Sequence, residues 1–261
     1  MKRRKILAFG LSLLCVGVLL GGCGAKNQTS KVEGAVASEE KTTLIMATNA
    51  TFPPYEYVEN NEYEGIDIEI AQAIADELGL ELVIEDVEFG SIIAGVESGK
   101  FDMGMAGMTV TEERLQNVNF SDTYATAVQS VIVPEGSTIA SIDDLSSDMK
   151  IGVQQDTTGD IYASDDYGDA VVRYKNGADA VQALVTGKVD CVIIDNEPAK
   201  AYVAANEGLI ILDSAYAEEE YAICIAKENE ELLTDINGAL AKLKADGTID
   251  AIVTKYIPTE D

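Results

Sequence analysis

The sequence predicts an α/β protein of two similar lobes, each built on a mainly parallel sheet flanked by helices. Short apolar runs typical of buried strands alternate with helical patterns, as expected for a parallel sheet. Two segments, 97–107 (ESGKFDMGMAG) and 185–195 (VTGKVDCVIID), share a helix end, Gly-Lys, an apolar residue, an Asp and then a strand. The part that we expect to fold, from Lys41 onward, has about 220 residues, enough for two lobes with their own cores.

Apolar spacing predicts the elements of the first half of this part. In the stretch 64–80, five apolar side chains share one helical face, and Gly79 stands where a glycine ends a helix in the left-handed conformation. The run at 91–99 predicts a short helix that also ends in glycine. The expected strands are 42–49, 81–87 and 100–107.

The pattern changes at 130–139 (SVIVPEGSTI), and the alternation of strand and helix patterns then begins again. Apolar runs predict further strands, and amphipathic stretches between them predict helices. Residues 231–257 predict a long helix and a shorter one, with Gly247 between them. The expected strands of this half are 150–155, 191–195, 209–213 and 221–229. Before the last pair of helices, we expect a helix with its exit turn at 177–190 and a helix at 200–208.

The first 22 residues indicate a targeting segment, a signal peptide that is removed. A basic start, MKRRK, precedes an apolar stretch, 6–20, that is too short for a stable membrane-spanning helix. It ends in LGGC, which resembles the lipobox of bacterial lipoproteins, so cleavage would leave Cys23 diacylated and anchored to the outer face of the membrane. The alternative is a secretory signal peptide with an incidental cysteine. Residues 24–40 are small and polar and predict a flexible tether.

Charge and composition exclude several classes of function. The net charge is −28, and removal of the four basic residues of the first 22 gives −28 − 4 = −32, which argues against a nucleic-acid partner. The chain has no histidine, so Ser-His, Cys-His and imidazole–metal chemistry are impossible. The acidic residues lack EF-hand spacing, so neither a metal site nor a cofactor is indicated. Cys191 and Cys224 lie inside apolar runs and are expected to be buried, inert thiols, with a disulfide between them as the alternative.

Arg114 stands at a position where a cation is locally unfavourable. Thr111 or Thr109 resembles a helix N-cap, and Thr109 with Glu112 fits a capping box. An N-cap at Thr111 would put the arginine in the first helical turn, where a cation costs up to about 1 kcal/mol. The plain interpretation is a solvated arginine that pairs with Glu112 or Glu113.

The predicted sheets bring opposite charges to equivalent places. Ligands of open α/β sheets bind beyond the carboxyl ends of the strands. Gly107 and Thr109 mark that end in the first lobe, close to Arg114, and Asp195 marks it in the second. A cation and a carboxylate at these two positions suit a zwitterion with a carboxylate and an ammonium group.

Several segments of the chain occur together in a specific order. They are the lipobox, 47–57 (ATNATFPPYEY), 64–79 (EGIDIEIAQAIADELG), 89–114 (FGSIIAGVESGKFDMGMAGMTVTEER), 118–124 (VNFSDTY), 150–159 (KIGVQQDTTG), 189–198 (VDCVIIDNEP) and 242–256 (KLKADGTIDAIVTKY). From about Lys41 to Pro258 they resemble the polar amino-acid binding proteins of ABC importers, solute-binding protein family 3. The resemblance implies the type II periplasmic binding protein fold, in which two lobes joined by two hinge strands close on the ligand. It divides the chain into lobe 1, 41–125 plus 222–261, and lobe 2, 126–221.

The resemblance also implies roles for single residues. Arg114 matches the arginine that grips the α-carboxylate of the ligand, a task that suits the planar guanidinium fork. Asp195 matches the carboxylate that holds the ammonium group, and Gly107 matches a residue whose backbone carbonyl accepts from the same group. Thr109 and Thr158 match residues that donate to the carboxylate, Thr158 from a helix N-terminus.

The remaining pocket positions concern the ligand side chain. Phe52 and Phe89 match two apolar walls, and Asn49 and Gln154 lie where the family distinguishes side chains. The alternatives are core aromatics for Phe52 and Phe89, a loop cap for Asp195, an N-cap for Thr158 and a solvent-facing Gln154. Family members commonly have glycine in place of Asp156, and several cation-binding members have an acid in place of Asn49. The side chain of the ligand is predicted to be polar neutral or basic.

The leading prediction is a non-enzymatic, monomeric substrate-binding lipoprotein on the outer face of the membrane. It would deliver a free L-amino acid to an ABC permease and its ATPase. One alternative is a ligand-sensing input protein for a membrane receptor. Another is a prephenate-type dehydratase, which would need a general acid in the pocket, and Asp156 is the unusual candidate.

Overall fold

The computed structural model describes residues 41–258. The predicted signal peptide (1–22), the predicted lipidation site Cys23 and the predicted tether lie outside the described residues. The strands are β1 Thr43–Thr48, β2 Thr51–Phe52, β3 Glu56–Glu59, β4 Glu62–Glu64, β5 Glu81–Asp86, β6 Met103–Gly104, β7 Val118–Phe120, β8 Ala125–Pro134, β9 Ile151–Gln154, β10 Val171–Tyr174, β11 Cys191–Asp195, β12 Leu209–Ile211, β13 Ala217–Tyr221 and β14 Cys224–Ala226. The helices are α1 Ile66–Leu78, α2 Ile92–Glu97, α3 Thr158–Tyr167, α4 Gly177–Val185, α5 Asn196–Ala205, α6 Glu230–Ala245 and α7 Thr248–Tyr256.

The first lobe is built on a sheet in the order β5-β1-β6-β14-β7. Strand β1 pairs in parallel with β5 and β6, whereas β14, from near the end of the chain, is antiparallel to β6. Successive side chains of β1 point to opposite faces. Leu44 and Met46 therefore pack in the same cluster as residues of α1 and α6, whereas Ala47 packs in the cluster that holds residues of α2.

The second lobe repeats this arrangement with a sheet in the order β10-β9-β11-β8-β12. Strand β9 is parallel to β10 and β11, and β8 is antiparallel to β11. In β11, Ile193 packs with Ile151 and Val153 of β9, whereas Val192 and Ile194 belong to the other apolar cluster, with residues of α4. The mixed α/β fold of two lobes that the sequence predicts is confirmed, with β8 and β14 as the antiparallel additions.

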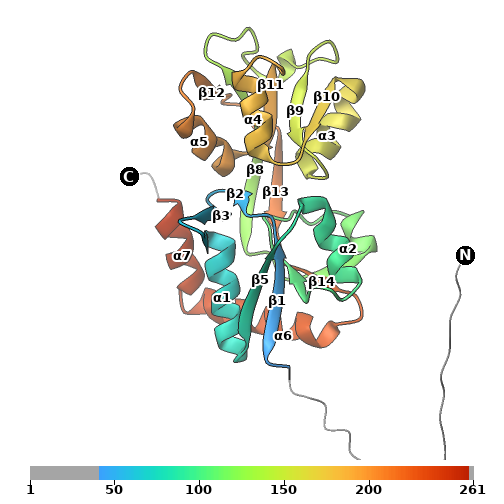
Figure 1. Cartoon of the computed structure of the whole chain (residues 1–261), viewed down its shortest axis with the longest axis vertical. Coiled ribbons are helices and arrows are strands. Elements are labelled where there is room, and N and C mark those ends of the chain that lie inside the picture. Colours follow the sequence, from blue (N-terminus) through green and yellow to red (C-terminus); the bar gives the residue numbers. More distant parts are fainter. Residues whose placement is uncertain (1–40, 259–261) are drawn as a thin grey trace, which may run out of the picture. The chain divides into compact units, whose positions relative to one another are not determined.

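Two strands run between the sheets. Strand β8 is the longest strand of the described region, and β13 pairs with its first half, from Ala217 opposite Gln129 to Tyr221 opposite Ala125. Both strands pass from one lobe to the other in Figure 1. Beyond β13 the chain re-enters the first sheet as β14, and an isolated bridge joins Thr109 to Tyr221.

Helix α1 shows how local sequence ends an element. Gly79 has φ 69° at its C-cap, the left-handed conformation that the glycine predicts, and its N–H donates to the carbonyls of the last turn. The hairpin β3–β4 turns through Asn60 and Asn61, both at positive φ, a conformation that asparagine tolerates. Neither this hairpin nor β10 was expected from apolar spacing.

The cysteines of the described region are free thiols. Cys191 in β11 and Cys224 in β14 are buried in the two different sheets, so the disulfide alternative is wrong. Burial raises the pKa of both thiols to about 12, which keeps them protonated and inert. Within residues 41–258 no helix has the length and apolar character to span a membrane, and no cluster of acidic or cysteine side chains suits a metal ion.

Candidate functional site

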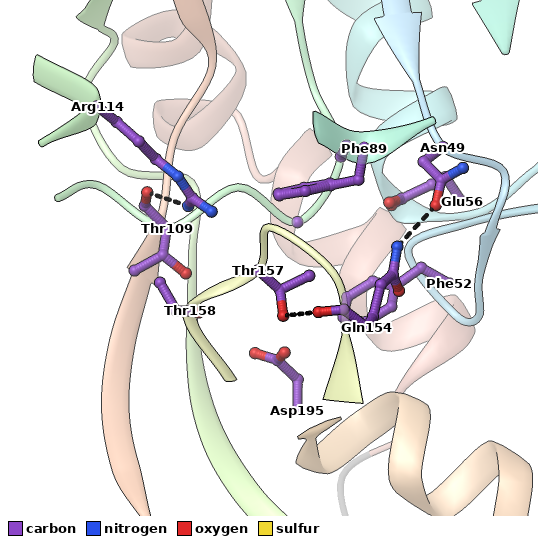
Figure 2. A pocket seen from close by; sticks show the side chains of 12 residues that line it. Asn49, Phe52, Glu56, Phe89, Thr109, Arg114, Gln154, Thr157, Thr158 and Asp195 are labelled. Atoms are coloured by element: carbon purple, nitrogen blue, oxygen red, sulfur yellow. Dashed lines mark hydrogen bonds between the residues drawn. The ribbon is translucent and has the colours of Figure 1, made fainter. Parts of the chain in front are cut away.

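One pocket between the two lobes collects all nine residues that the resemblance assigns to ligand binding. The empty space among these residues is about 320 Å³, including solvent at its mouth. The lining comes from the first lobe and from the second, and Figure 2 shows the side chains converging on one space. The lining residues are Asn49, Phe52, Glu56, Phe89, Ala106, Gly107, Thr109, Arg114, Gln154, Thr157, Thr158 and Asp195.

Arg114 is buried, with 6% of its surface exposed, so the solvated interpretation is wrong. Its Nη1 donates to the Thr109 carbonyl at 2.7 Å, and its Nη2 donates to the Asp156 carbonyl, from the second lobe, at 3.2 Å. The guanidinium carbon lies 5.3 Å from the centre of the Phe89 ring. Burial lowers the pKa of Arg114, although a guanidinium stays charged in proteins. Within residues 41–258 its acceptors are neutral carbonyls, so its charge has no ion-pair partner there.

The backbone around Arg114 differs from the expected helix. Residues Arg114–Gln116 form a single 3₁₀ turn, and the Arg114 N–H donates to the Thr111 hydroxyl at 3.2 Å. Thr109 instead forms the bridge to Tyr221 of β13. The capping box of Thr109 with Glu112 is therefore wrong, because strand pairing holds Thr109 away from the turn. The first-turn position of Arg114 is retained, but the helix is too short to have a large dipole.

Asp195 ends β11 and lies in the pocket with 7% of its surface exposed. It accepts hydrogen bonds from the Tyr221 hydroxyl and from Gln129 Nε2, the latter at 2.8 Å. The same amide nitrogen donates to Glu219 at 3.0 Å, so two carboxylates from different strands share one donor. Burial and repulsion from Glu219 raise the pKa of Asp195 to about 8. Asp195 precedes α5 but its side chain makes no capping hydrogen bond, so the loop-cap alternative is wrong.

An amide pair joins the lobes on the other side of the pocket. Gln154 Nε2 donates to Asn49 Oδ1 at 2.9 Å, and Asn49 Nδ2 donates to the Val87 carbonyl at 2.8 Å. Gln154 is 4% exposed, so it does not point into solvent. The two amides face each other across the lobes in Figure 2 and are fixed by their own contacts.

Aromatic rings and a helix N-terminus complete the lining. Phe52 and Phe89 line the pocket at 8% and 9% exposure, so they are not merely core residues. The cap of α3 is Thr157, whose hydroxyl accepts from the Asp160 N–H at 3.3 Å. Thr158 is therefore the first residue of α3 and not its cap, and it lies at the positive end of the helix dipole.

Gly107 brings backbone close to the pocket. Its φ is 52°, and a Cβ there would lie 2.8 Å from the Phe52 ring. Its N–H donates to Asp67 Oδ2 at 2.8 Å, and the same oxygen accepts from the Tyr124 hydroxyl. Burial raises the pKa of Asp67 to about 7. A residue other than glycine would thus strain the backbone and clash with a pocket wall.

Sequence reasoning missed three lining residues, Glu56, Ala106 and Thr157. Glu56 is 1% exposed, and burial, with the Asp67 carboxyl next, raises its pKa well above the ordinary value. It is the cross-strand partner of Phe52 in the pairing of β2 with β3. The register of that short hairpin could therefore have predicted that Glu56 lies beside the pocket. Thr157 could have been found as an N-cap three residues before Asp160.

The comparisons with known proteins agree on one family. The family model of bacterial extracellular solute-binding proteins, family 3, matches residues 44–259. The arginine-binding extracellular protein ArtP of Bacillus subtilis is 31% identical over 252 residues, which cover 94% of this chain and 95% of that protein.

Two solved structures extend the comparison to three dimensions. An ancestral arginine-binding protein bound to glutamine is 39% identical, with a TM-score of 0.80 over 84% of this chain and 99% of that one. The ancestral amino acid-binding protein AncCDT-1, described as a precursor of cyclohexadienyl dehydratase, is 34% identical, with a TM-score of 0.76 over 82% and 94%. By sequence and by fold, the chain belongs to the bacterial extracellular solute-binding proteins, family 3.

Proposed function

We propose that this protein captures a free L-amino acid between its two lobes and delivers it to an ABC permease and its ATPase. The observation that supports this most is the pairing of charges in one pocket. A buried guanidinium, Arg114, without an ion-pair partner in the described region, and a buried carboxylate, Asp195, line it from different lobes. A zwitterion placed between them would satisfy both groups.

In this proposal each pocket residue has one task. Arg114 and the Thr109 hydroxyl hold the α-carboxylate, with N–H donors of α3 at Thr158. Asp195 and the Gly107 carbonyl hold the ammonium group. Phe52 and Phe89 enclose the aliphatic part of the side chain, whose apolar surface they would remove from water.

The ligand side chain is polar neutral or basic, and Glu56 favours a basic one. Asn49 and Gln154 offer amides that suit a neutral polar group. Glu56 lines the same pocket, and burial raises its pKa. A cationic side chain beside it would favour its ionised form and pair with it. The relatives named for arginine fit this preference, and the solved one bound to glutamine fits the amides.

Binding would close the lobes about β8 and β13. The proposed boundaries are 41–125 plus 222–261 for lobe 1 and 126–221 for lobe 2. A lipid on Cys23 would hold the monomeric protein at the outer face of the membrane, where the family is extracellular. Confirmation of this anchor requires mass analysis of the natural N-terminus.

The dehydratase alternative is favoured by one finding, the likeness to a dehydratase precursor, although that protein is itself described as amino acid-binding. Turnover of prephenate by the purified chain would support the alternative. The sensory alternative predicts a kinase or chemoreceptor, and not a permease, among the membrane proteins that the ligand-bound protein retains. We propose that the protein is not an enzyme.

A thermal-shift panel tests the proposed function. Protein from Gly24 onward is unfolded and refolded to remove carried-over ligand, then melted with each of twenty amino acids and with ornithine, citrulline and cystine. A ligand at a hundred times its Kd adds about 2.7 kcal/mol of stability, a shift of a few degrees. Shifts confined to basic or amide side chains are expected. A cooperative melt that no amino acid shifts would contradict the proposal.

A further inference from the structure

Gly90 and Asp156 meet across the two lobes without room for another atom. Gly90 lies in the 3₁₀ turn Phe89–Ser91 of the first lobe, and Asp156 lies in the turn between β9 and α3 of the second. A Cβ on Gly90 would lie 2.1 Å from Asp156 Oδ2 and 2.9 Å from its Cγ. Both separations are below van der Waals contact, so an alanine at residue 90 would push the lobes apart or displace the aspartate.

The backbone of Asp156 is held in an uncommon conformation. Its φ is 64°, a left-handed value that aspartate tolerates better than most residues. Its N–H donates to Asp160 Oδ2 at 3.1 Å, and Arg173 Nε donates to the same carboxylate at 2.9 Å. The loop that carries Asp156 is therefore held by α3 and β10. A Cβ at residue 90 could be accommodated only if the aspartate changed its own rotamer or the lobes moved apart.

The same residue reaches the first lobe a second time. The Asp156 carbonyl accepts from Arg114 Nη2 at 3.2 Å. Arg114 also stacks over Phe89, the neighbour of Gly90. One residue of the second lobe thus contacts both the ligand-facing arginine and the turn that carries a pocket wall.

We propose that Asp156 is a positioning residue for capture, which through its fit against bare Gly90 and its carbonyl bond to Arg114 sets how tightly the lobes close on an amino acid. This inference rests on the proposed function. The contact joins the two lobes and is not part of the core of either one, so it affects affinity and not the fold of either lobe.

Two substitutions and their combination test the proposal. Gly90→Ala in the full chain is expected to weaken binding of L-arginine about tenfold, as overpacking does, while the melting temperature of ligand-free protein stays near that of wild type. Gly90→Ala in an Asp156→Gly background is expected to weaken binding by less than about twofold relative to Asp156→Gly, because the clashing side chain is gone and glycine accepts the left-handed backbone. Gly238→Ala is the matched control, since that glycine lies in α6 with no atom within 4 Å of its Cβ position.

Calorimetry and small-angle scattering provide the measurements. Weaker binding with less compaction in Gly90→Ala, reversed in the double variant, supports the proposal. An equal loss in both backgrounds, or no loss in either, overturns it while the proposed function stands. If wild-type protein binds no amino acid, the proposed function fails, and this inference fails with it.

Discussion

The third parallel strand of each sheet, β6 in the first and β11 in the second, begins with the same hydrogen bonds but is followed by a different segment. At the start of β6, the Asp102 N–H donates to the Ile45 carbonyl at 2.9 Å, and its Oδ2 accepts from the Ile45 N–H at 2.7 Å. At the start of β11, Asp190 makes the same two bonds with Lys150, both at 2.8 Å. In the repeated Gly-Lys-apolar-Asp pattern, the aspartate therefore joins the start of one strand to its parallel neighbour.

Beyond the strands the two lobes diverge. After β6 the chain passes Gly107 at positive φ and pairs Thr109 with β13 before it turns at Arg114. After β11 it enters α5 directly, which leaves Asp195 at the strand end. The two lobes thus share a scaffold but place opposite charges in the pocket. The segment that follows β6 carries a cation, whereas the end of β11 carries an anion.

Substitution of Arg114, the cation of the first lobe, should weaken ligand binding more than any other change proposed here. In Arg114→Ala the ligand carboxylate keeps no charged partner, so affinity should fall by about 3 kcal/mol, roughly 100-fold. Arg114→Lys, which retains the charge without the fork, should recover only part of this. Calorimetry measures both, and near-wild-type affinity of the alanine variant would contradict the assigned role.

Removal of the anion should have a smaller effect that depends on pH. Asp195 must be ionised to hold an ammonium group, and its pKa is raised from 3.8 to about 8. Affinity of the wild type should therefore rise from pH 6 to pH 8, and the ligand should displace a proton. Asp195→Asn should weaken binding by about 2 kcal/mol at pH 8 and show a flatter pH profile.

Calorimetry at several pH values, in buffers of different ionisation enthalpy, separates the two effects. Equal pH profiles for wild type and Asp195→Asn would show that another group titrates. Glu219 shares a donor with Asp195, so Glu219→Gln serves as the control that keeps the ammonium partner and removes its repulsive neighbour.

Substitution of Asp102 or Asp190, which make the same bonds at the starts of β6 and β11, should lower the stability of the protein and leave its ligand affinity unchanged. Asp102→Ala and Asp190→Ala each leave a backbone N–H without its carboxylate partner, so each should cost about 1 kcal/mol in free energy of unfolding. Urea unfolding measures the cost, and calorimetry checks that affinity is retained. If only one substitution lowers the free energy of unfolding, the two aspartates occupy equivalent places in the sequence but contribute unequally to stability.

Much of the scaffold could be predicted from the sequence by itself. Buried strands such as 191–195 and the helix that ends at Gly79 follow from apolar spacing and from the freedom of glycine at positive φ. The echo of Asp102 and Asp190 indicated two lobes built alike, and the order of the motifs implied the family and the pocket residues.

The tertiary structure alone decided how those residues meet. Thr109 is extended because β13 pairs with it, which no local pattern indicates. Glu56 enters the pocket through the register of a two-residue strand, and its raised pKa comes from burial and from Asp67. The contact of Gly90 with Asp156 joins residues far apart in the chain. Local sequence determines where strands and helices begin and end, whereas long-range packing determines which groups lose water and face one another.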